Sequence, residues 1–224
     1  MGWDEWVRGV EVEPSLYAAD FSRLGEQIEI LLAAGARIFH FDVGDGHFVP
    51  PVTIGPIVLQ WISPIVHRAG GRLDCHLMVE QPERHFEAIA EAGGDSVTFH
   101  YEVADDVAGL AAQARELGLG VGLAFNPRTE PDQVADVADP VDLVLCMSIE
   151  PGYSGQPFMP EAIPRVQRLR SLLPAGKHVQ VDGGVGRDNV PQLRAAGADL
   201  LVAGTSIFGA DDISQACREL VALA

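Results

Sequence analysis

Short runs of apolar residues alternate along this chain with longer segments in which apolar positions recur every three or four residues. The short runs predict β-strands, and the longer segments predict amphipathic helices. The predicted strands cover residues 10–18, 36–43, 71–78, 95–101, 119–125, 141–148, 178–183 and 199–205. The predicted helices cover residues 21–35, 54–70, 82–94, 105–118, 129–139, 159–173, 187–197 and 212–223. Several of these helices end in a glycine, as is typical of helix C-termini, at Gly35, Gly70, Gly93, Gly118 and Gly197.

The regular alternation of strand and helix favours parallel βαβ units, and eight such units predict an α/β protein of the (β/α)8 (TIM) barrel type. An open doubly wound sheet is the alternative, but the segment PSLYAADF lacks the GxGxxG pattern that usually follows the first strand of such a sheet. No linker, low-complexity stretch or charge block divides the 224 residues. We therefore expect a single barrel domain over residues 1–224, in which residues 1–9 form an N-terminal extension.

The net charge of −17 limits the classes of partner. An acidic surface repels the phosphates of nucleic acids and anionic lipid head groups, so neither is an expected partner. No apolar run approaches the roughly 20 residues that span a bilayer. The N-terminal segment MGWDEWVRG is too acidic for a signal peptide. A small substrate remains, and it can be anionic where a local field opposes the overall charge.

Cysteine and lysine usage narrows the chemistry further. Cys75, Cys146 and Cys217 have no CxxC spacing and are expected to be buried free thiols in the cytoplasm. The chain has a single lysine, Lys177, which precedes a predicted strand and so lies opposite the catalytic face of a barrel. Schiff-base chemistry needs a desolvated lysine in the pocket and is therefore not expected.

Polar residues occur near the ends of three predicted strands. His40 and Asp42 are two residues apart, so their side chains share one face, and Asp74 and His76 repeat this spacing on the next strand. Asp182 ends the seventh strand. Burying an unpartnered carboxylate is costly, whereas imidazole and carboxylate together suit zinc, iron or manganese. We expect a metal-assisted acid/base site with Asp74 orienting a ligand, the alternative being that these pairs are structural. The candidate ligands are His40, Asp42, His76 and Asp182.

Glycine-bearing loops follow three of the predicted strands, in EPGYSGQPF (150–158), VDGGV (181–185) and VAGTSIF (202–208). Backbone N–H groups in such loops can approach an anion closely. Loops after strands seven and eight form the recurrent phosphate site of barrel enzymes. The loops therefore favour a phosphorylated substrate, the alternative being that the glycines only make tight turns.

The remaining histidines and the tryptophans carry less information. His47 and Asp45, after the second strand, are interpreted as structural. Surface positions or local caps are expected for His67, His85, His100 and His178. Trp3 and Trp6 precede the first strand and are compatible with covering the bottom of a barrel or with meeting a partner.

The chain resembles the ribulose-phosphate 3-epimerase family from about residue 12 to residue 208. The segments that carry the resemblance are PSLYAADF (14–21), FHFDVGDGHFVP (39–50), DCHLMVEQPE (74–83), NPRTEP (126–131), MSIEPGYSGQPF (147–158), VDGGV (181–185) and VAGTSIF (202–208). Together these motifs are highly specific. The resemblance implies a metal-dependent barrel enzyme that forms a homo-oligomer.

The resemblance also implies a role for each candidate residue. Four metal ligands are implied, at His40, Asp42, His76 and Asp182. Asp42 and Asp182 would be the acid/base pair, and Ser15 and His76 would contact the sugar. The phosphate would be held by Gly152, Tyr153, Ser154, Gly155, Gly183, Gly184, Gly204 and Thr205. The implied reaction converts D-ribulose 5-phosphate to D-xylulose 5-phosphate by inversion at C3 through a cis-enediolate.

Three departures from the family pattern bear on the substrate. Gly44 stands where the family usually carries Met, Tyr17 and Ala18 replace Leu-Ser, and Ser154 replaces a glycine. We expect Gly44 to leave a void beside the metal and Tyr17 to fill it, which would re-line the pocket.

Two alternative functions stay open beside the epimerase interpretation, and a third is not expected. The first is a 3-epimerase of another ketose phosphate, such as a hexulose phosphate, and the second is a phosphosugar-binding barrel without catalysis. The third, a lyase of the related barrel type, needs an Asp-x-Lys-x-x-Asp array that Lys177 cannot provide.

Overall fold

The computed structural model describes residues 2–224 and confirms the (β/α)8 barrel. Eight parallel strands pair in the order β1-β8-β7-β6-β5-β4-β3-β2, and a bridge between Ser15 and His40 joins the two ends of this order. The strands are β1 (Glu11–Pro14), β2 (Ile38–Gly44), β3 (Arg72–Met78), β4 (Ser96–His100), β5 (Gly120–Phe125), β6 (Leu143–Met147), β7 (His178–Asp182) and β8 (Leu200–Ala203).

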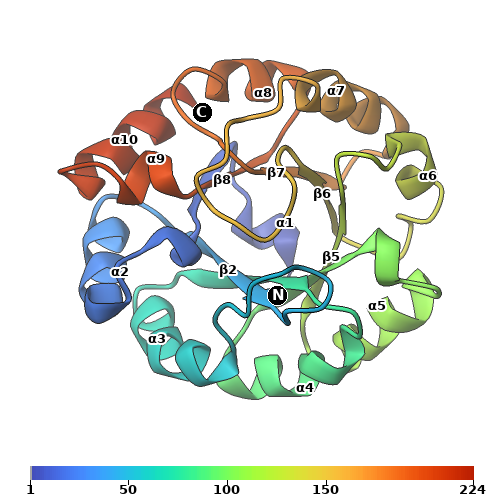
Figure 1. The fold of residues 1–224 in the computed structure, drawn as a ribbon, viewed down its shortest axis with the longest axis horizontal. Coiled ribbons are helices and arrows are strands. Elements are labelled where there is room, and N and C mark those ends of the chain that lie inside the picture. The colour runs from blue at the N-terminus through green and yellow to red at the C-terminus, as the bar shows by residue number, and fades with distance from the viewer. Residues whose placement is uncertain (1) are drawn as a thin grey trace.

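Helices surround the strands as a ring (Figure 1). The α-helices are α1 (Trp3–Trp6), α2 (Leu24–Ala33), α3 (Pro56–Arg68), α4 (Glu83–Ala92), α5 (Val107–Glu116), α6 (Pro131–Ala135), α7 (Ala162–Leu172), α8 (Val190–Ala196), α9 (Thr205–Phe208) and α10 (Ile213–Leu223). Short 3₁₀ turns are η1 (Leu16–Ala18), η2 (Phe21–Arg23) and η3 (Tyr101–Val103). The glycines predicted to end helices all have positive φ, as at Gly197, where φ is 100° and α8 ends.

The first and last strands end earlier than predicted. The strand expected at 10–18 stops at Pro14 and continues as the turn η1, and the strand expected at 199–205 stops at Ala203, before α9. Leu16 and Ile207 are nonetheless fully buried, because these turns pack over the rim of the barrel. A run of apolar residues does not by itself distinguish a strand from a buried turn that follows it.

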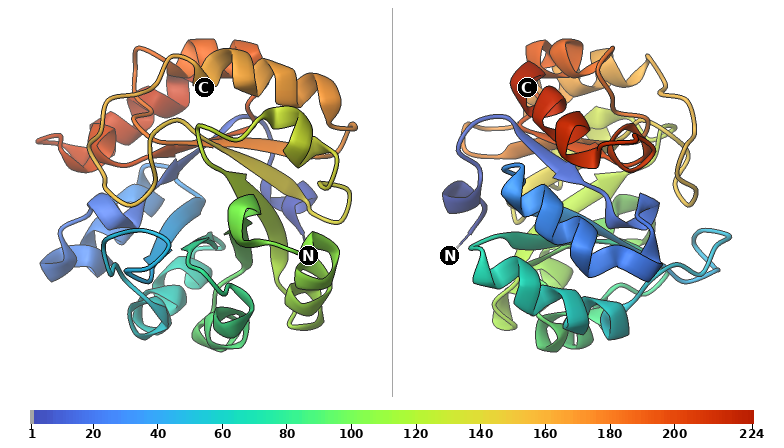
Figure 2. Two further views of the ribbon diagram at one scale, coloured as in Figure 1. Left: turned by 45° about the vertical axis from the view of Figure 1, so that its right-hand side comes forward. Right: turned by 90° about the vertical axis from the view of Figure 1, so that its left-hand side faces the viewer.

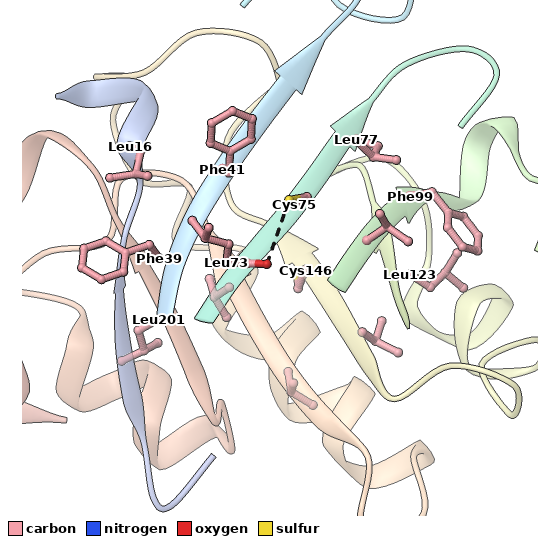
Figure 3. Close-up of a cluster of buried hydrophobic side chains, with 14 of the residues drawn as sticks. Leu16, Phe39, Phe41, Leu73, Cys75, Leu77, Phe99, Leu123, Cys146 and Leu201 are labelled. Atoms are coloured by element: carbon pink, nitrogen blue, oxygen red, sulfur yellow. Dashed lines mark hydrogen bonds between the residues drawn. The ribbon is translucent and has the colours of Figure 1, made fainter. Parts of the chain in front are cut away.

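Successive strand residues face opposite sides of the barrel wall. Phe39 and Phe41 of β2, with Leu73, Cys75 and Leu77 of β3, belong to the core between strands and helices (Figure 3). The residues between them in the sequence therefore face the inside of the barrel. This alternation directs the polar residues of both strands inward.

The inside of the barrel is divided into a polar part and an apolar part. The buried polar residues come from strands β1 to β4, from β7 and from the residue that follows β1. They are Glu13, Ser15, His40, Asp42, Asp74, His76, Ser96, Thr98, His100 and Gln180. The apolar part comes mainly from β5, β6 and β8, and its strand residues include Ala124, Leu143, Leu145, Met147 and Leu200. The division places the polar chemistry against strands β1 to β4 and β7.

Trp3 and Trp6 close the end of the barrel at which the strands begin. Their rings lie 4.9 Å apart between centroids, and both belong to the apolar interior cluster. A Cβ built on Gly120, at the start of β5, would lie 3.0 Å from Trp3 Nε1. The right-hand view of Figure 2 shows α1 at the end opposite the loops that follow β2 and β6. The tryptophans therefore cover the bottom of the barrel, which the sequence had left open.

Two expectations from composition can be compared with the structure. Lys177 donates hydrogen bonds to the carbonyl oxygens of Asp139 and Val141 near the starts of β6 and β7, away from the strand ends that carry the candidate site. Cys75, Cys146 and Cys217 are buried and unpaired, as expected. No helix within residues 2–224 combines the length and apolarity needed to cross a membrane.

Candidate active site

The structure brings the four candidate ligands together at the carboxyl-terminal ends of β2, β3 and β7. One ligand atom from each of His40, Asp42, His76 and Asp182 lies within 4.8 Å of the others. Asp42 Oδ1 is 3.3 Å from His40 Nε2 and 3.2 Å from His76 Nδ1. Asp182 Oδ2 is 3.9 Å from His76 Nδ1. Both imidazoles are fully buried, whereas the Asp182 side chain is 16% exposed, so the cluster is reached from the Asp182 side.

The donor set fits a divalent cation. Ligand atoms that share one ion with bonds of about 2.0–2.2 Å lie about 3–3.5 Å apart, and the contacts of Asp42 with His40 and His76, at 3.3 and 3.2 Å, fall in this range, whereas Asp182 Oδ2 is 3.9 Å from His76 Nδ1. His40 Nε2 is buried and makes no hydrogen bond of good geometry among the described residues, although Asp42 Oδ1 lies 3.3 Å away. An orphaned buried nitrogen is uncommon in a folded protein, and a cation between the side chains would satisfy it. Two imidazoles and two carboxylates can therefore hold a metal ion here.

The two carboxyl groups sit in different electrostatic environments. Burial, and then the charge of Asp42, raise the pKa of Asp182 to about 7. Burial acts in the same direction at Asp42, but His40 and His76 outweigh it and hold the pKa of Asp42 well below its ordinary value. The surroundings thus push the pKa values of two neighbouring carboxyls apart, which is a feature of acid/base sites.

A buried network lies behind His40. His40 Nδ1 is 3.0 Å from Asp74 Oδ2, and Asp74 also accepts hydrogen bonds from Ser96 and Gln180, each at 2.8 Å. Gln180 donates a second bond to Glu13. Burial, followed by the charge of Asp74, raises the pKa of Glu13 well above its ordinary value. Asp74 therefore orients His40, as the sequence suggested, through the contact that a metal-binding imidazole usually makes.

His100 was placed wrongly by the sequence analysis, which expected a surface position or a local cap. The residue is fully buried at the end of β4, with its Nε2 2.8 Å from His76 Nε2. Its Nδ1 is 3.2 Å from Glu102 Oε2. The signal was present in the sequence, because His100 and Glu102 repeat the spacing of His40 and Asp42 at a strand end.

A pocket opens above the cluster. Asp42 and Asp182 line it together with nearly all the residues expected to bind substrate, which are Ser15, Gly152, Tyr153, Ser154, Gly155, Gly183, Gly184, Gly204 and Thr205. His40 and His76 are not in its lining, because both lie fully buried beneath it. The structure therefore separates His76, which was expected to touch the sugar, from the pocket surface.

The loop after β7 requires glycine for steric reasons. A Cβ on Gly183 would lie 2.4 Å from Ile149 Cγ1, and one on Gly184 would lie 2.6 Å from the backbone nitrogen of Phe158. Ser148 Oγ donates to the carbonyl oxygens of Asp182 and Gly183 at 2.9 and 2.6 Å, respectively. This bracing fixes the loop directly after Asp182, and Ser148 is a residue that the sequence analysis did not single out.

The expected void at Gly44 is absent. A Cβ at Gly44 would already lie 3.0 Å from Val49 Cγ2 and from the carbonyl oxygen of Pro51, because the loop after β2 folds back over the glycine. Thr53 fixes this fold by accepting from the Gly44 N–H at 2.6 Å. Tyr17 lines the pocket but does not fill a gap left by Gly44. The prediction that Tyr17 fills a void left by Gly44 is therefore wrong, although Tyr17 does form part of the pocket lining.

The fold and the site together define a (β/α)8-barrel enzyme in which two carboxyls line a glycine-rich pocket above two buried imidazoles. Residues 11–208 match the ribulose-phosphate 3 epimerase family, and the chain belongs to this family. It is 37% identical to a ribulose-phosphate 3-epimerase of Bacillus subtilis over 215 residues, which cover 94% of this chain and 98% of the relative. It is 39% identical to the ribulose-phosphate 3-epimerase of Mycobacterium tuberculosis, over 95% of this chain and 92% of the relative.

The solved structures show how widely the fold is shared. A tryptophan synthase chain from M. tuberculosis superposes with a TM-score of 0.71 at 18% identity, covering 98% of this chain and 95% of that one. At this level of identity the likeness concerns the fold alone, and the site must identify the chemistry.

Proposed function

We propose that this chain is a metal-dependent epimerase that inverts C3 of D-ribulose 5-phosphate and so forms D-xylulose 5-phosphate. The observation that carries the proposal is that Asp42 and Asp182 line one pocket and also share a ligand cluster with two buried histidines. Inversion at a carbon needs one group that removes a proton and another that delivers a proton to the opposite face. A pair of carboxyls in one pocket can supply both functions.

The chemistry of the substrate defines the steps. The hydrogen on C3 lies next to the C2 carbonyl, so its removal leaves an enediolate. One of the two aspartates removes this proton, and the other delivers a proton to the opposite face of C3. The roles exchange in the reverse direction. Ser15 donates to Asp42 Oδ2 at 2.7 Å, which leaves Oδ1 directed at the histidine cluster.

The proposed cofactor is one divalent ion, zinc, iron or manganese, because imidazole and carboxylate ligands suit each of these metals. Bound in the cluster, such an ion would polarise the C2 carbonyl and the C3 hydroxyl and so stabilise the enediolate. The protein orients the ligands themselves, since Asp74 holds His40 and His100 contacts His76.

The glycine loops are the proposed phosphate site. Three of them line the same pocket as the two aspartates, namely residues 152–155, 183–184 and 204–205. Their backbone N–H groups can bind a dianion without the positive side chains that the pocket lining lacks. Anchoring the phosphate there would hold C3 near both carboxyls. Binding would raise the rate of proton transfer in this way, because the reacting groups are already in position.

Hydrogen exchange at C3 tests this proposal. Incubation of D-ribulose 5-phosphate with the enzyme in D2O is expected to place deuterium at C3 of both pentulose phosphates, as read by NMR. Asp42→Asn and Asp182→Asn should each reduce this exchange by more than about 100-fold, since general acid/base catalysis contributes about 10²–10⁴ in rate. A chelator should abolish exchange, and added metal should restore it.

Asp132→Asn is the control for this experiment. Asp132 pairs with Arg168 on the outside of the barrel, where its side chain is 52% exposed, so the same chemical change there should leave exchange intact. Exchange that survives both active-site substitutions would contradict the epimerase mechanism. Binding of the sugar phosphate without any exchange would identify a non-catalytic binding barrel.

Tyr17 bears on the choice of ketose phosphate. Tyr17 lines the same pocket as Asp42, and burial and then the charge of Asp42 raise the pKa of the Tyr17 phenol. Its size should limit the sugar that fits, so Tyr17→Leu is expected to improve kcat/KM for hexulose phosphates relative to ribulose 5-phosphate. An unchanged preference across a panel of ketose phosphates would show that Tyr17 does not select the substrate.

Homo-oligomer formation and a cytoplasmic location belong to the same proposal. Phe21, Ile57 and Trp61 are exposed by 47%, 67% and 73% and border one hollow between α2 and α3, and an apolar patch of this kind supports association of copies. Trp61→Glu should then lower the molar mass measured by light scattering. The three buried, unpaired cysteines support a reducing compartment.

A further inference from the structure

A chain of hydrogen bonds leads from His76 to the loop between β5 and α6. His76 Nε2 is 2.8 Å from His100 Nε2, and His100 Nδ1 is 3.2 Å from Glu102 Oε2. The other oxygen of Glu102, Oε1, accepts from the backbone N–H of Asn126 at 2.8 Å and from the hydroxyl of Thr129. The epimerisation steps proposed above use neither His100 nor Glu102.

The partners determine where each proton lies. A carboxylate accepts hydrogen bonds, so His100 Nδ1 carries the proton that points to Glu102. The neutral ring of His100 then has a lone pair on Nε2, and this lone pair accepts from His76 Nε2. His76 consequently has its lone pair on Nδ1 when a cation occupies the ligand cluster, whereas without a cation Asp42 Oδ1, 3.2 Å away, is a competing acceptor for a proton on that nitrogen.

The surroundings protect this arrangement from water. His76 and His100 are both fully buried, and their rings stack with centroids 5.0 Å apart. Phe48 packs on His100 with a centroid separation of 4.7 Å. Arg165 donates to the carbonyl oxygens of Asn126 and Thr129 at 2.7 and 3.1 Å, which holds the loop that anchors Glu102. Bulk solvent therefore does not reach the two histidine nitrogens that face each other.

We propose that His100 and Glu102 are positioning residues that fix the tautomer of His76, so that its Nδ1 lone pair faces the metal site. This inference rests on the proposed metal site. It assigns the control of metal affinity to Glu102, which does not touch the ligand His76 but acts on it through His100. Groups that hold metal-binding histidines in this way typically change metal affinity by about 10- to 100-fold when they are replaced.

Glu102→Gln is a specific test because the only change is the replacement of one carboxylate oxygen by an NH2 group. Asn126 and Thr129 both donate to Oε1, so the glutamine oxygen stays there and its NH2 group faces His100 Nδ1. An NH2 group donates, so His100 must move its proton to Nε2. That nitrogen then donates to His76 Nε2, and the His76 proton moves to Nδ1, where it blocks the ligand position.

The first measurement is the tautomer itself, read from long-range ¹H–¹⁵N correlations of the full-length chain before and after Zn²⁺ is added. At a Zn²⁺ concentration that saturates the original protein, His76 should carry its proton on Nε2 in the original protein and still carry it on Nδ1, facing Asp42 Oδ1, in the Glu102→Gln variant. An unchanged His76 tautomer in the variant would overturn the inference, whatever the catalytic activity of the protein.

The second measurement is affinity for Zn²⁺ and Co²⁺, by calorimetry and by the visible spectrum of the cobalt form. Glu102→Gln and His100→Leu should each weaken binding by about 10- to 100-fold. His100→Gln, whose amide oxygen can accept from His76 Nε2, should recover part of the loss. If His100→Leu does not fold, Glu102→Gln alone decides the matter.

Asp95→Asn is the matched control, because Asp95 also accepts from a histidine, His67, and from a backbone N–H, but belongs to the loop before β4. Its metal affinity should match that of the original protein. Equal affinity in Glu102→Gln would contradict the inference and leave the proposed function standing. Failure of the original protein to bind any divalent ion would instead overturn both.

Discussion

The hydroxyl of Ser15 donates a hydrogen bond of 2.7 Å to Asp42 Oδ2, across the same junction at which the backbone of Ser15 pairs with His40. Ser15 directly follows β1 and Asp42 lies on β2, the two strands that close the barrel. The contact that closes the barrel and the hydrogen bond that orients the Asp42 carboxyl therefore come from the same residue, Ser15.

Ser15→Ala should reduce activity without unfolding the protein. A hydrogen bond to a charged group contributes about 1.5–3 kcal/mol, so kcat/KM is expected to fall by roughly 10- to 150-fold. Steady-state assays with thermal unfolding measure both effects. Ser63→Ala is the control, because Ser63 Oγ donates at 2.9 Å to the carbonyl oxygen of Ala92, outside the barrel wall. An equal loss of activity in both variants would show that the effect is structural.

Gly184→Ala should impair substrate binding. Gly184 has a φ of 63°, and an added Cβ would lie 2.6 Å from the Phe158 backbone nitrogen, so the loop must move. The expected result is an increase in KM of at least about tenfold with a smaller change in kcat, since the phosphate anchor is displaced before the reacting groups are. Gly186→Ala is the control, because its Cβ would meet nothing closer than 3.6 Å. Unchanged KM in Gly184→Ala would remove this loop from the phosphate site.

Trp3→Ala should lower the free energy of unfolding by about 3–5 kcal/mol, the usual cost of removing a fully buried large aromatic side chain. The side chain is 2% exposed and packs at the opposite end of the barrel from Asp42 and Asp182. Urea denaturation measures the loss of stability. The folded fraction should retain its kcat, and a large fall in kcat would mean that the bottom of the barrel affects the reacting groups.

Glu102→Gln should also change the pH dependence of stability. Burial alone would raise the pKa of Glu102, but hydrogen bonds from His100, Thr129 and the Asn126 N–H lower it to about 2. A pKa below that of the unfolded chain, near 4.5, means that ionised Glu102 stabilises the fold above pH 4.5. This contribution is lost as the pH falls from 4.5 towards 2.

Urea titrations at several pH values check this sign. The difference in unfolding free energy between the original protein and Glu102→Gln should be constant from pH 8 to pH 6 and should shrink below pH 4.5. A difference of the same size at pH 4 and pH 7 would show that Glu102 has an ordinary pKa.

The sequence predicted the barrel and its candidate ligands because both follow from local periodicity. Alternation along a strand is enough to put His40 and Asp42 on one face, and parallel strands bring their carboxyl ends together. His100 escaped this reasoning, since its role depends on a contact with His76 on the neighbouring strand. The packing of Val49 on Gly44 likewise arises from a loop that folds back, and no pattern within the strand reveals it.

The divided interior of the barrel implies two different rates of change among related chains. On β5, β6 and β8, one aliphatic side chain can replace another at modest cost, because shape is all that the position requires. On the remaining strands most inward groups are hydrogen-bonded to at least one other, as Gln180 is to Glu13 and Asp74. A replacement there leaves a buried partner without its hydrogen bond, so such positions should change together across homologues. The aliphatic positions should instead change one residue at a time.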